Sequence, residues 1–205
     1  MIKNRGYGET IWDGYADWAE SAEKDNIRDL QTKITGTGNW HPNYVSPSFQ
    51  FACEALVAIN RINYDKVTVL DFGCGLGRNA SVLRSFFPRV IALDLPEMIV
   101  RLKAEHLDNL YDSVYDNLDG IKNETVNVVY DSVVWQHIVS IPYVTELVNR
   151  LVEIPSLNAV VSLTNQSVNS LPLRLLMENH GWKKVLSDTE TQTFGSPHNL
   201  TVLRR

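Results

Sequence analysis

The order of apolar runs and amphipathic stretches divides the chain into two parts. From Lys66 onward, short β-branched runs alternate with segments in which apolar residues recur at helical spacing. The short runs predict strands at 67–72, 90–93, 113–115, 126–130 and 159–163. The amphipathic segments predict helices at 79–87, from 96 to about 107, from about 141 onward and at 171–180, where Gly181 ends the helix. Two final runs, 182–186 and 200–204, predict a closing hairpin-like pair of strands.

Strands that alternate with helices predict right-handed crossovers and a mostly parallel sheet. Such a sheet is covered by helices on both faces. We therefore predict an α/β fold with a doubly wound, mostly parallel, seven-stranded sheet. Ligands of these sheets bind outside the carboxyl ends of the strands. The loops that follow the strands are therefore where chemistry is expected.

The first 66 residues have a different pattern of apolar and aromatic positions. Aromatic and small residues at helical spacing predict an amphipathic helix there: Trp12, Tyr15, Trp18, Ala19 and Ala22. A turn-rich stretch follows, and Ser46-Pro47 then begins a second predicted helix that runs to about 62. No apolar run near the first residues has the length of a secretory signal, and none in the chain reaches that of a membrane span. We expect neither a signal peptide nor a membrane segment.

The composition is that of an ordinary globular protein, with 44% hydrophobic and 21% charged residues in a chain of 205. Nineteen Lys and Arg residues against 24 Asp and Glu residues give a net charge of −5, which disfavours a broad nucleic-acid-binding surface. Two cysteines, Cys53 and Cys74, make no disulfide framework, so we expect a cytoplasmic location. The histidines show no metal-ligand spacing, and we expect no metal site.

The first predicted strand ends in a run of alternate glycines, Asp71-Phe-Gly73-Cys-Gly75-Leu-Gly77-Arg78. Glycine permits a tight turn and close approach of the backbone to a ligand, and the helix that follows presents free N–H groups. Counted from Gly75, the run also fits the dinucleotide pattern G-x-G-x-x-A, so an NAD site is an alternative. Asp71 argues against it, because a carboxylate repels a pyrophosphate and favours a ligand that carries an amine or a sulfonium group.

The stretch from Val69 to Arg78 closely resembles the first motif of the class I S-adenosylmethionine (SAM)-dependent methyltransferases, and the resemblance runs in order from Val67 to the C-terminus. It implies a Rossmann-like fold, methyl transfer from SAM, and S-adenosylhomocysteine (SAH) as the product. Residues 67–205 would then be the SAM-binding domain. In this family the residues before the first strand often form helices over the active site, so residues 1–66 would be an N-terminal helical cap or lid.

The resemblance also implies a cofactor site. Asp94, at the end of the second predicted strand, takes the place at which the family holds the SAM ribose, and an acid there suits two hydroxyl groups. Asp116 would accept a hydrogen bond from the adenine amine, although Asp-Asn is equally a turn-forming pair. Asp131 or Ser132 would line the methionine half of SAM. The predicted cofactor-binding set is Asp71, Gly73, Cys74, Gly75, Gly77, Asp94, Leu95, Met98, Asp116, Asn117, Asp131 and Ser132.

His137 is the candidate catalytic residue. A histidine has an ordinary pKa of about 6.5, which suits a general base for a hydroxyl acceptor. A histidine that only orients its own loop fits the same position. The residues predicted to contact the acceptor, by stacking or by cation–π attraction, are Trp12, Tyr15, Trp40, His41 and Trp135. Packing of the N-terminal helix on the sheet domain is the alternative role for Trp12 and Trp18.

No motif names the methyl acceptor. The tetrad [ND]-P-P-[YF], which marks many amino-methyltransferases that act on nucleobases or glutamine, is absent from the sequence. The acidic charge also points away from nucleic acid. We therefore expect a small-molecule acceptor. The alternatives are a protein or RNA acceptor, a non-catalytic SAM-binding module, and an NAD-dependent oxidoreductase.

Overall fold

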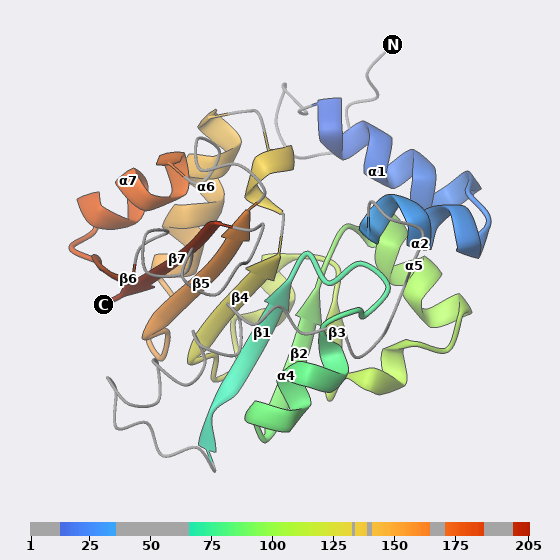
Figure 1. The fold of residues 1–205 in the computed structure, drawn as a ribbon. Coiled ribbons are helices and arrows are strands. Elements are labelled where there is room, and N and C mark those ends of the chain that lie inside the picture. The colour runs from blue at the N-terminus through green and yellow to red at the C-terminus, as the bar shows by residue number, and fades with distance from the viewer. Residues whose placement is uncertain (1–12, 36–65, 133, 139–140, 165–170, 187–198) are drawn as a thin grey trace.

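The computed structural model describes residues 13–35, 66–132, 134–138, 141–164, 171–186 and 199–205, which include one seven-stranded sheet with helices on both faces (Figure 1). The strands are β1 (Thr68–Phe72), β2 (Arg89–Leu93), β3 (Ser113–Tyr115), β4 (Val128–Ser132), β5 (Ala159–Thr164), β6 (Lys183–Leu186) and β7 (Asn199–Arg204). Their order across the sheet is β3-β2-β1-β4-β5-β7-β6. The predicted Rossmann-like α/β fold is confirmed.

The first five strands run parallel, and β7 lies antiparallel between β5 and β6. The predicted closing pair of strands is therefore confirmed. At the carboxyl edge of the sheet, Phe72 of β1 pairs with Leu93 of β2 and with Asp131 of β4. The strand order reverses at β1, so the topological switch point lies at this edge, where a ligand site is expected.

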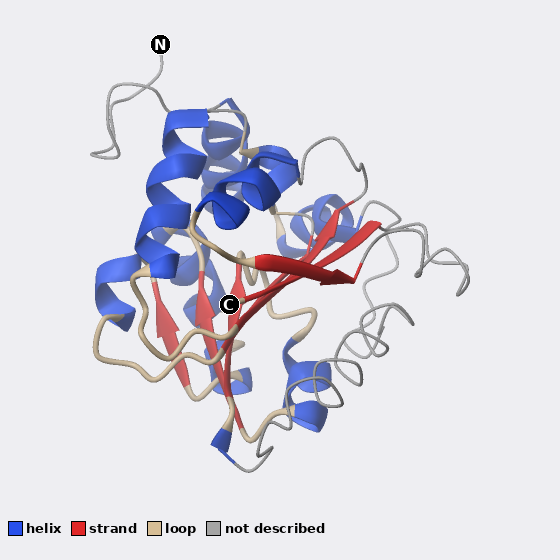
Figure 2. Cartoon of the chain, turned by 90° about the vertical axis from the view of Figure 1, so that its left-hand side faces the viewer, coloured by secondary structure: helices blue, strands red, loops and turns tan. Residues whose placement is uncertain are grey.

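Among the described residues, two helices cover each face of the sheet (Figures 1 and 2). They are α4 (Ala80–Phe86), α5 (Pro96–Ala104), α6 (Ile141–Val152) and α7 (Leu171–Asn179). Val69 of β1 packs in the same core as Leu83 of α4, whereas its neighbour Leu70 packs in the opposite core with Leu151 of α6. All five residues of β1 are buried, as expected for a strand that is covered on both faces.

The strand β4 begins at Val128, two residues later than predicted. The two preceding backbone N–H groups donate hydrogen bonds outside the pairing of β4 with its neighbouring strands. The Val126 N–H donates to the hydroxyl of Ser156 at 3.0 Å, and the Asn127 N–H donates to the carbonyl oxygen of Thr68 at 2.9 Å. These two residues therefore tie the start of β4 to its surroundings before its pairing with β5 begins.

The ends of two helices follow from their backbone conformation. The helix α5 ends at Ala104, earlier than the predicted position near 107, and His106 follows with a φ of +56°. A left-handed residue cannot continue a right-handed helix. The helix α7 ends before Gly181, which has a φ of +82°, so the predicted helix-ending glycine is confirmed.

Two helices precede β1 in the described chain, α1 (Asp13–Lys24) and α2 (Ile27–Thr35), and they lie over the carboxyl edge of the sheet near α5 (Figure 1). Asn26 caps α2, because its side-chain oxygen accepts the N–H of Asp29 at 3.0 Å. A small core joins these helices to the sheet domain: Ala22, Leu30, Leu76 and Met98. The second predicted N-terminal helix, 46–62, lies outside the described residues. Within the described ranges, no helix has the length and apolar character needed to cross a membrane.

Candidate functional site

The loop after β1 comes close to Val134, two residues beyond the end of β4. Gly73 opens this loop with a φ of +72°, and a Cβ atom built on it would lie 2.3 Å from Cγ2 of Val134. Only glycine combines a favourable left-handed backbone conformation with the absence of a Cβ atom, for which there is no room here. The Gly73 N–H donates to the carbonyl oxygen of Leu93 at 2.8 Å. The loop is therefore held where the ends of β1, β2 and β4 meet.

Asp94 follows β2 and joins it to the same loop. One of its carboxylate oxygens accepts the Gly75 N–H at 2.6 Å, and the other accepts the Leu95 N–H at 2.7 Å. Burial raises the pKa of Asp94 to about 6, and the two backbone hydrogen bonds oppose that rise. A carboxylate has about four acceptor sites. Asp94 therefore keeps acceptor capacity for a ligand after it has bound the loop.

A second buried acid lies at the end of β1. Asp71 is 1% exposed, and its Oδ2 accepts the hydroxyl of Tyr111 at 2.7 Å. Burial raises the pKa of Asp71 to about 7; the hydrogen bond from Tyr111 lowers it, and the charge of Asp94 raises it further. The other oxygen, Oδ1, is buried and has no hydrogen-bond partner among the described residues. Because an unsatisfied buried acceptor is costly, this atom fits a ligand that brings a positive charge or an N–H group.

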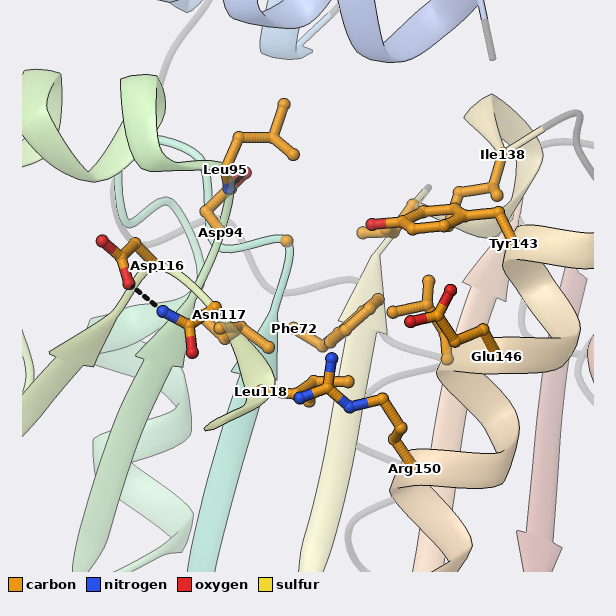
Figure 3. Close-up of a pocket in the computed structure, with 14 residues that line it drawn as sticks. Phe72, Asp94, Leu95, Asp116, Asn117, Leu118, Ile138, Tyr143, Glu146 and Arg150 are labelled. Atoms are coloured by element: carbon orange, nitrogen blue, oxygen red, sulfur yellow. Dashed lines mark hydrogen bonds between the residues drawn. The ribbon is translucent and has the colours of Figure 1, made fainter. Parts of the chain in front are cut away.

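A pocket of about 610 Å³, counted with its open mouth, lies between the strand ends and α6 (Figure 3). The strand-end side of the pocket consists of Phe72, Gly73, Leu93, Asp94, Leu95, Asp116, Asn117, Leu118, Val134 and Ile138. The α6 side consists of Tyr143, Glu146, Leu147 and Arg150. The pocket thus brings together the predicted residues that follow β1, β2 and β3.

Sequence reasoning missed the α6 side of the pocket. Tyr143, Glu146 and Arg150 are spaced by three and four residues, so they share one face of the helix, and Figure 3 shows their side chains on the pocket side of α6. Arg150 donates to Oδ1 of Asp119 at 2.8 Å, which anchors its guanidinium group. The helical spacing was the available signal, but polar residues at that spacing are also typical of a solvent-facing helix.

Residues 70–154 match the family model described as a methyltransferase domain. The matched segment contains the glycine loop, Asp94 and the end of β4. The match covers 85 of the 205 residues and identifies a methyltransferase-domain segment in this chain. No curated protein sequence matches the chain at a significant level.

Several solved methyltransferase structures share this fold. Magnesium protoporphyrin IX methyltransferase from Synechocystis PCC 6803, with bound SAM, superposes with a TM-score of 0.62 at 12% identity, covering 97% of this chain and 100% of that one. The N-methyltransferase NodS from Bradyrhizobium japonicum WM9, in complex with SAH, gives a TM-score of 0.60 at 12% identity, covering 94% and 98%. The methyltransferase domain of bacterial CtHen1 gives 0.52 at 16% identity, covering 76% and 98%. At these identities the likeness shows the fold.

The residues of this methyltransferase fit its cofactor, SAM. Asp94 has acceptor capacity left for hydroxyl groups at the end of β2. The unpartnered oxygen of Asp71 suits a positively charged group beside the glycine loop, and Leu95 gives the pocket an apolar surface next to Asp94. When bound, SAM supplies a methyl group that its sulfonium makes electrophilic. Asp94, Asp71 and the glycine loop would hold the cofactor in this site.

Two predicted site residues of the β4 segment lie in the core of the methyltransferase. Asp131 is fully buried; its Oδ2 accepts the indole N–H of Trp135 at 2.6 Å, and its Oδ1 accepts the hydroxyl of Ser162 at 3.0 Å. Trp135 is 2% exposed and stacks on Phe72 with ring centroids 5.2 Å apart. Neither side chain belongs to the pocket lining, although Asp131 was predicted beside the cofactor and Trp135 beside the acceptor. Both oxygens of the acid are satisfied inside the core, and the indole fills the space next to β1.

The other predicted residues of the β4 segment lie nearer the sheet edge. Ser132 accepts a hydrogen bond from the Arg78 guanidinium at 3.2 Å, so it joins the end of β4 to the glycine loop. His137 belongs to the short helix η4 (Trp135–His137), and its ring contacts Trp18 of α1. The pocket lining contains Val134 and Ile138 from the two ends of η4 and does not contain His137.

The remaining predicted residues are distributed unevenly over the site. Asn117 caps the turn after β3, since its Oδ1 accepts the Gly120 N–H at 3.1 Å, and Asp116 accepts from the amide of Asn117 at 2.5 Å. Four further cofactor candidates are buried and do not belong to the pocket lining: Asp71, Cys74, Gly77 and Met98. Burial raises the pKa of the Cys74 thiol, which fits a backbone role for this residue. Trp12, Trp40 and His41 lie outside the described residues, and Tyr15 belongs to α1.

Proposed function

We propose that this methyltransferase transfers the methyl group of SAM to a small-molecule acceptor. The observation that carries the proposal is the charge of the pocket. Of the described lining side chains, three are acids, Asp94, Asp116 and Glu146, and the one cation among them, Arg150, is already paired with Asp119. Such a lining does not suit a polyanion, and the net charge of −5 supports the same conclusion.

The proposed division of the chain follows from the packing. Residues 67–205 would bind SAM, and residues 1–66 would cover the site and help to select the acceptor. Ile34 of α2 lies 3.4 Å from the position that a Cβ on Gly75 would take, so α2 rests directly on the glycine loop. Leu30 and Leu76 are fully buried in the core between the cap and the loop. This contact supports a cap that shields the site from water.

In the proposed reaction the protein acts mainly by placement. Asp94 would hold hydroxyl groups of the cofactor, the loop at Gly73 and Gly75 would approach it through the backbone, and Asp71 would face its positively charged end. Alignment of two reactants in one site supplies a large part of a rate enhancement. A base is required only when the acceptor must lose a proton. His137, next to the pocket-lining residues of η4, is the candidate for that role.

The test is transfer of a radiolabelled methyl group from SAM to separated fractions of a cell extract: small molecules, RNA and protein. The expected result is label in the small-molecule fraction, lost when Asp94 is replaced by Asn. Label in RNA or protein alone would contradict the small-molecule acceptor. Labelled products from the Asp94→Asn variant at the wild-type rate would contradict the site itself.

A further inference from the structure

A chain of three side chains links the two N-terminal helices to the end of β4. The ring of Trp18 in α1 meets the imidazole of His137 edge to face, with centroids 5.5 Å apart and planes inclined by 78°. The ammonium group of Lys33 in α2 lies 5.0 Å from the centroid of the Trp18 ring. Lys33 also donates a hydrogen bond to the hydroxyl of Ser21 in α1, which fixes its position between the helices. The cap therefore contributes to the surroundings of His137.

The surroundings of His137 disfavour a charge on its ring. Its side chain is partly buried, and burial lowers its pKa; the positive charge of Lys33 lowers it further. Lys33 is the charged group of the described elements that acts on this ring, and Trp18 excludes water from the side of the ring that it covers. Both effects act in the same direction, so the neutral imidazole prevails at neutral pH.

The short helix η4 connects His137 with the pocket lining. Val134 and Ile138, at the two ends of η4, line the pocket, whereas His137 contacts the cap. The ring thus contacts the cap, and His137 belongs to the same turn of chain as the two pocket-lining residues Val134 and Ile138. A neutral imidazole at that place is a proton acceptor.

We infer that Trp18 and Lys33 are positioning residues for His137, Trp18 by holding the plane of its ring and Lys33 by keeping it neutral as a base. This inference rests on the proposed function, and it defines the acceptor as a small molecule whose nucleophile carries a proton, a hydroxyl group above all. In the transfer, the hydroxyl oxygen forms its bond to the methyl carbon as the carbon–sulfur bond breaks, and the bonding pair stays with sulfur. The hydroxyl proton goes to the imidazole nitrogen of His137 and then to solvent.

The test is an NMR titration of the histidine rings in the full chain, which contains five histidines. The His137 signal is assigned by its loss in His137→Gln. The inference predicts that Lys33→Met shifts the titration midpoint of His137 upward and that Lys33→Arg restores it. Lys24→Met is the matched control, because it removes an exposed cap lysine that pairs with Glu20, and it leaves the midpoint unchanged.

A second variant, Trp18→Ala, tests the role of Trp18 in holding the His137 ring. It exposes the ring, so the midpoint is expected to rise and the ring signal to broaden relative to wild type. A His137 midpoint that is the same in Lys33→Met as in Lys24→Met, or one that does not move in Trp18→Ala, would overturn the inference. Calorimetric titration of the same samples with SAH tests the proposed function separately, since wild-type protein that binds no SAH would refute that function whatever the histidine does.

Discussion

The carboxylate of Asp94 accepts the backbone N–H of Gly75 at 2.6 Å, so the end of β2 and the glycine loop are joined by a charge-assisted hydrogen bond. The same carboxylate is the expected ligand of the cofactor ribose. One side chain therefore shapes the loop and, under the proposed function, would also hold the cofactor. This double role makes Asp94 the residue on which the site depends most.

Replacing Asp94 by Asn should weaken SAH binding by about 1.5–3 kcal/mol, because hydrogen bonds to a charged acceptor are lost. This corresponds to a dissociation constant about 10–150 times higher, measured by calorimetry. Asp112→Asn is the matched control. Its carboxylate also accepts an N–H of β2, that of Val90 at 2.8 Å, but at the opposite edge of the sheet. Equal SAH affinities for the two variants would contradict the assignment of Asp94.

SAH binding should weaken as the pH falls below about 6. Burial holds the pKa of Asp94 at about 6 in the free protein, and a bound hydroxyl group needs the ionised form. Below that pH a proton must leave before the ligand binds, so affinity falls with decreasing pH and protons are released on binding. Asp71, with a pKa of about 7, acts in the same direction. Calorimetry in buffers of different ionisation enthalpy measures the proton release, and proton uptake at pH 5.5 would contradict this account.

Gly73→Ala should cost more stability than Gly181→Ala, although both glycines have positive φ angles. A left-handed alanine costs about 1–2 kcal/mol at either site. Only at Gly73 does the added Cβ also meet a neighbour, Cγ2 of Val134 at 2.3 Å, whereas nothing lies within 4 Å at Gly181. Chemical denaturation compares the two free energies of unfolding. SAH binding should be lost in Gly73→Ala and kept in Gly181→Ala; the same loss in both would show that the loop has no special part in binding.

Trp135→Phe should destabilise the protein and leave SAH affinity nearly unchanged. The substitution removes the indole N–H from the buried carboxylate of Asp131, and an unsatisfied buried acceptor costs about 1–3 kcal/mol. Thermal unfolding and calorimetry on the same sample separate the two effects. A large loss of SAH affinity in a variant of wild-type stability would instead return Trp135 to the ligand site.

Leu30→Ala should loosen the cap without unfolding the sheet. Leu30 is fully buried against Leu76 of the glycine loop and Met98 of α5, and truncation of such a leucine costs about 2–5 kcal/mol. Hydrogen exchange should rise in α1 and α2 and stay slow in β1 and β4. Exchange that rises equally in the strands would mean that the cap and the sheet unfold as one unit.

The sheet and the glycine loop could be predicted from the sequence because their signals are local. β-branched runs give the strands, and the glycines mark the turn at Gly73. The position of Asp94 directly after β2 was predicted correctly, because the apolar run that forms β2 ends at Leu93. Asp131 shows the limit of this reasoning. An acid at a strand end looks the same whether it faces a ligand or the indole of a tryptophan four residues later, and only the packing decides between them.

The α6 side of the pocket and the contact of Trp18 with His137 were beyond sequence reasoning for another reason. Both join segments that are distant in the chain, and neither leaves a motif. In the sequence, Trp18 is one residue of an aromatic stripe, and its partner His137 lies more than a hundred residues further along the chain. The crossover topology brings α6 next to the strand ends, which the order of elements predicted only in outline.

The most direct test of the central claim is a calorimetric titration of the wild-type protein and of Asp94→Asn with SAH and with NAD at pH 7.5. The account predicts one SAH site in the wild-type protein, a dissociation constant about 10–150 times higher in the variant, and no binding of NAD by either. Binding of NAD in place of SAH, or an unchanged SAH affinity in Asp94→Asn, would contradict it.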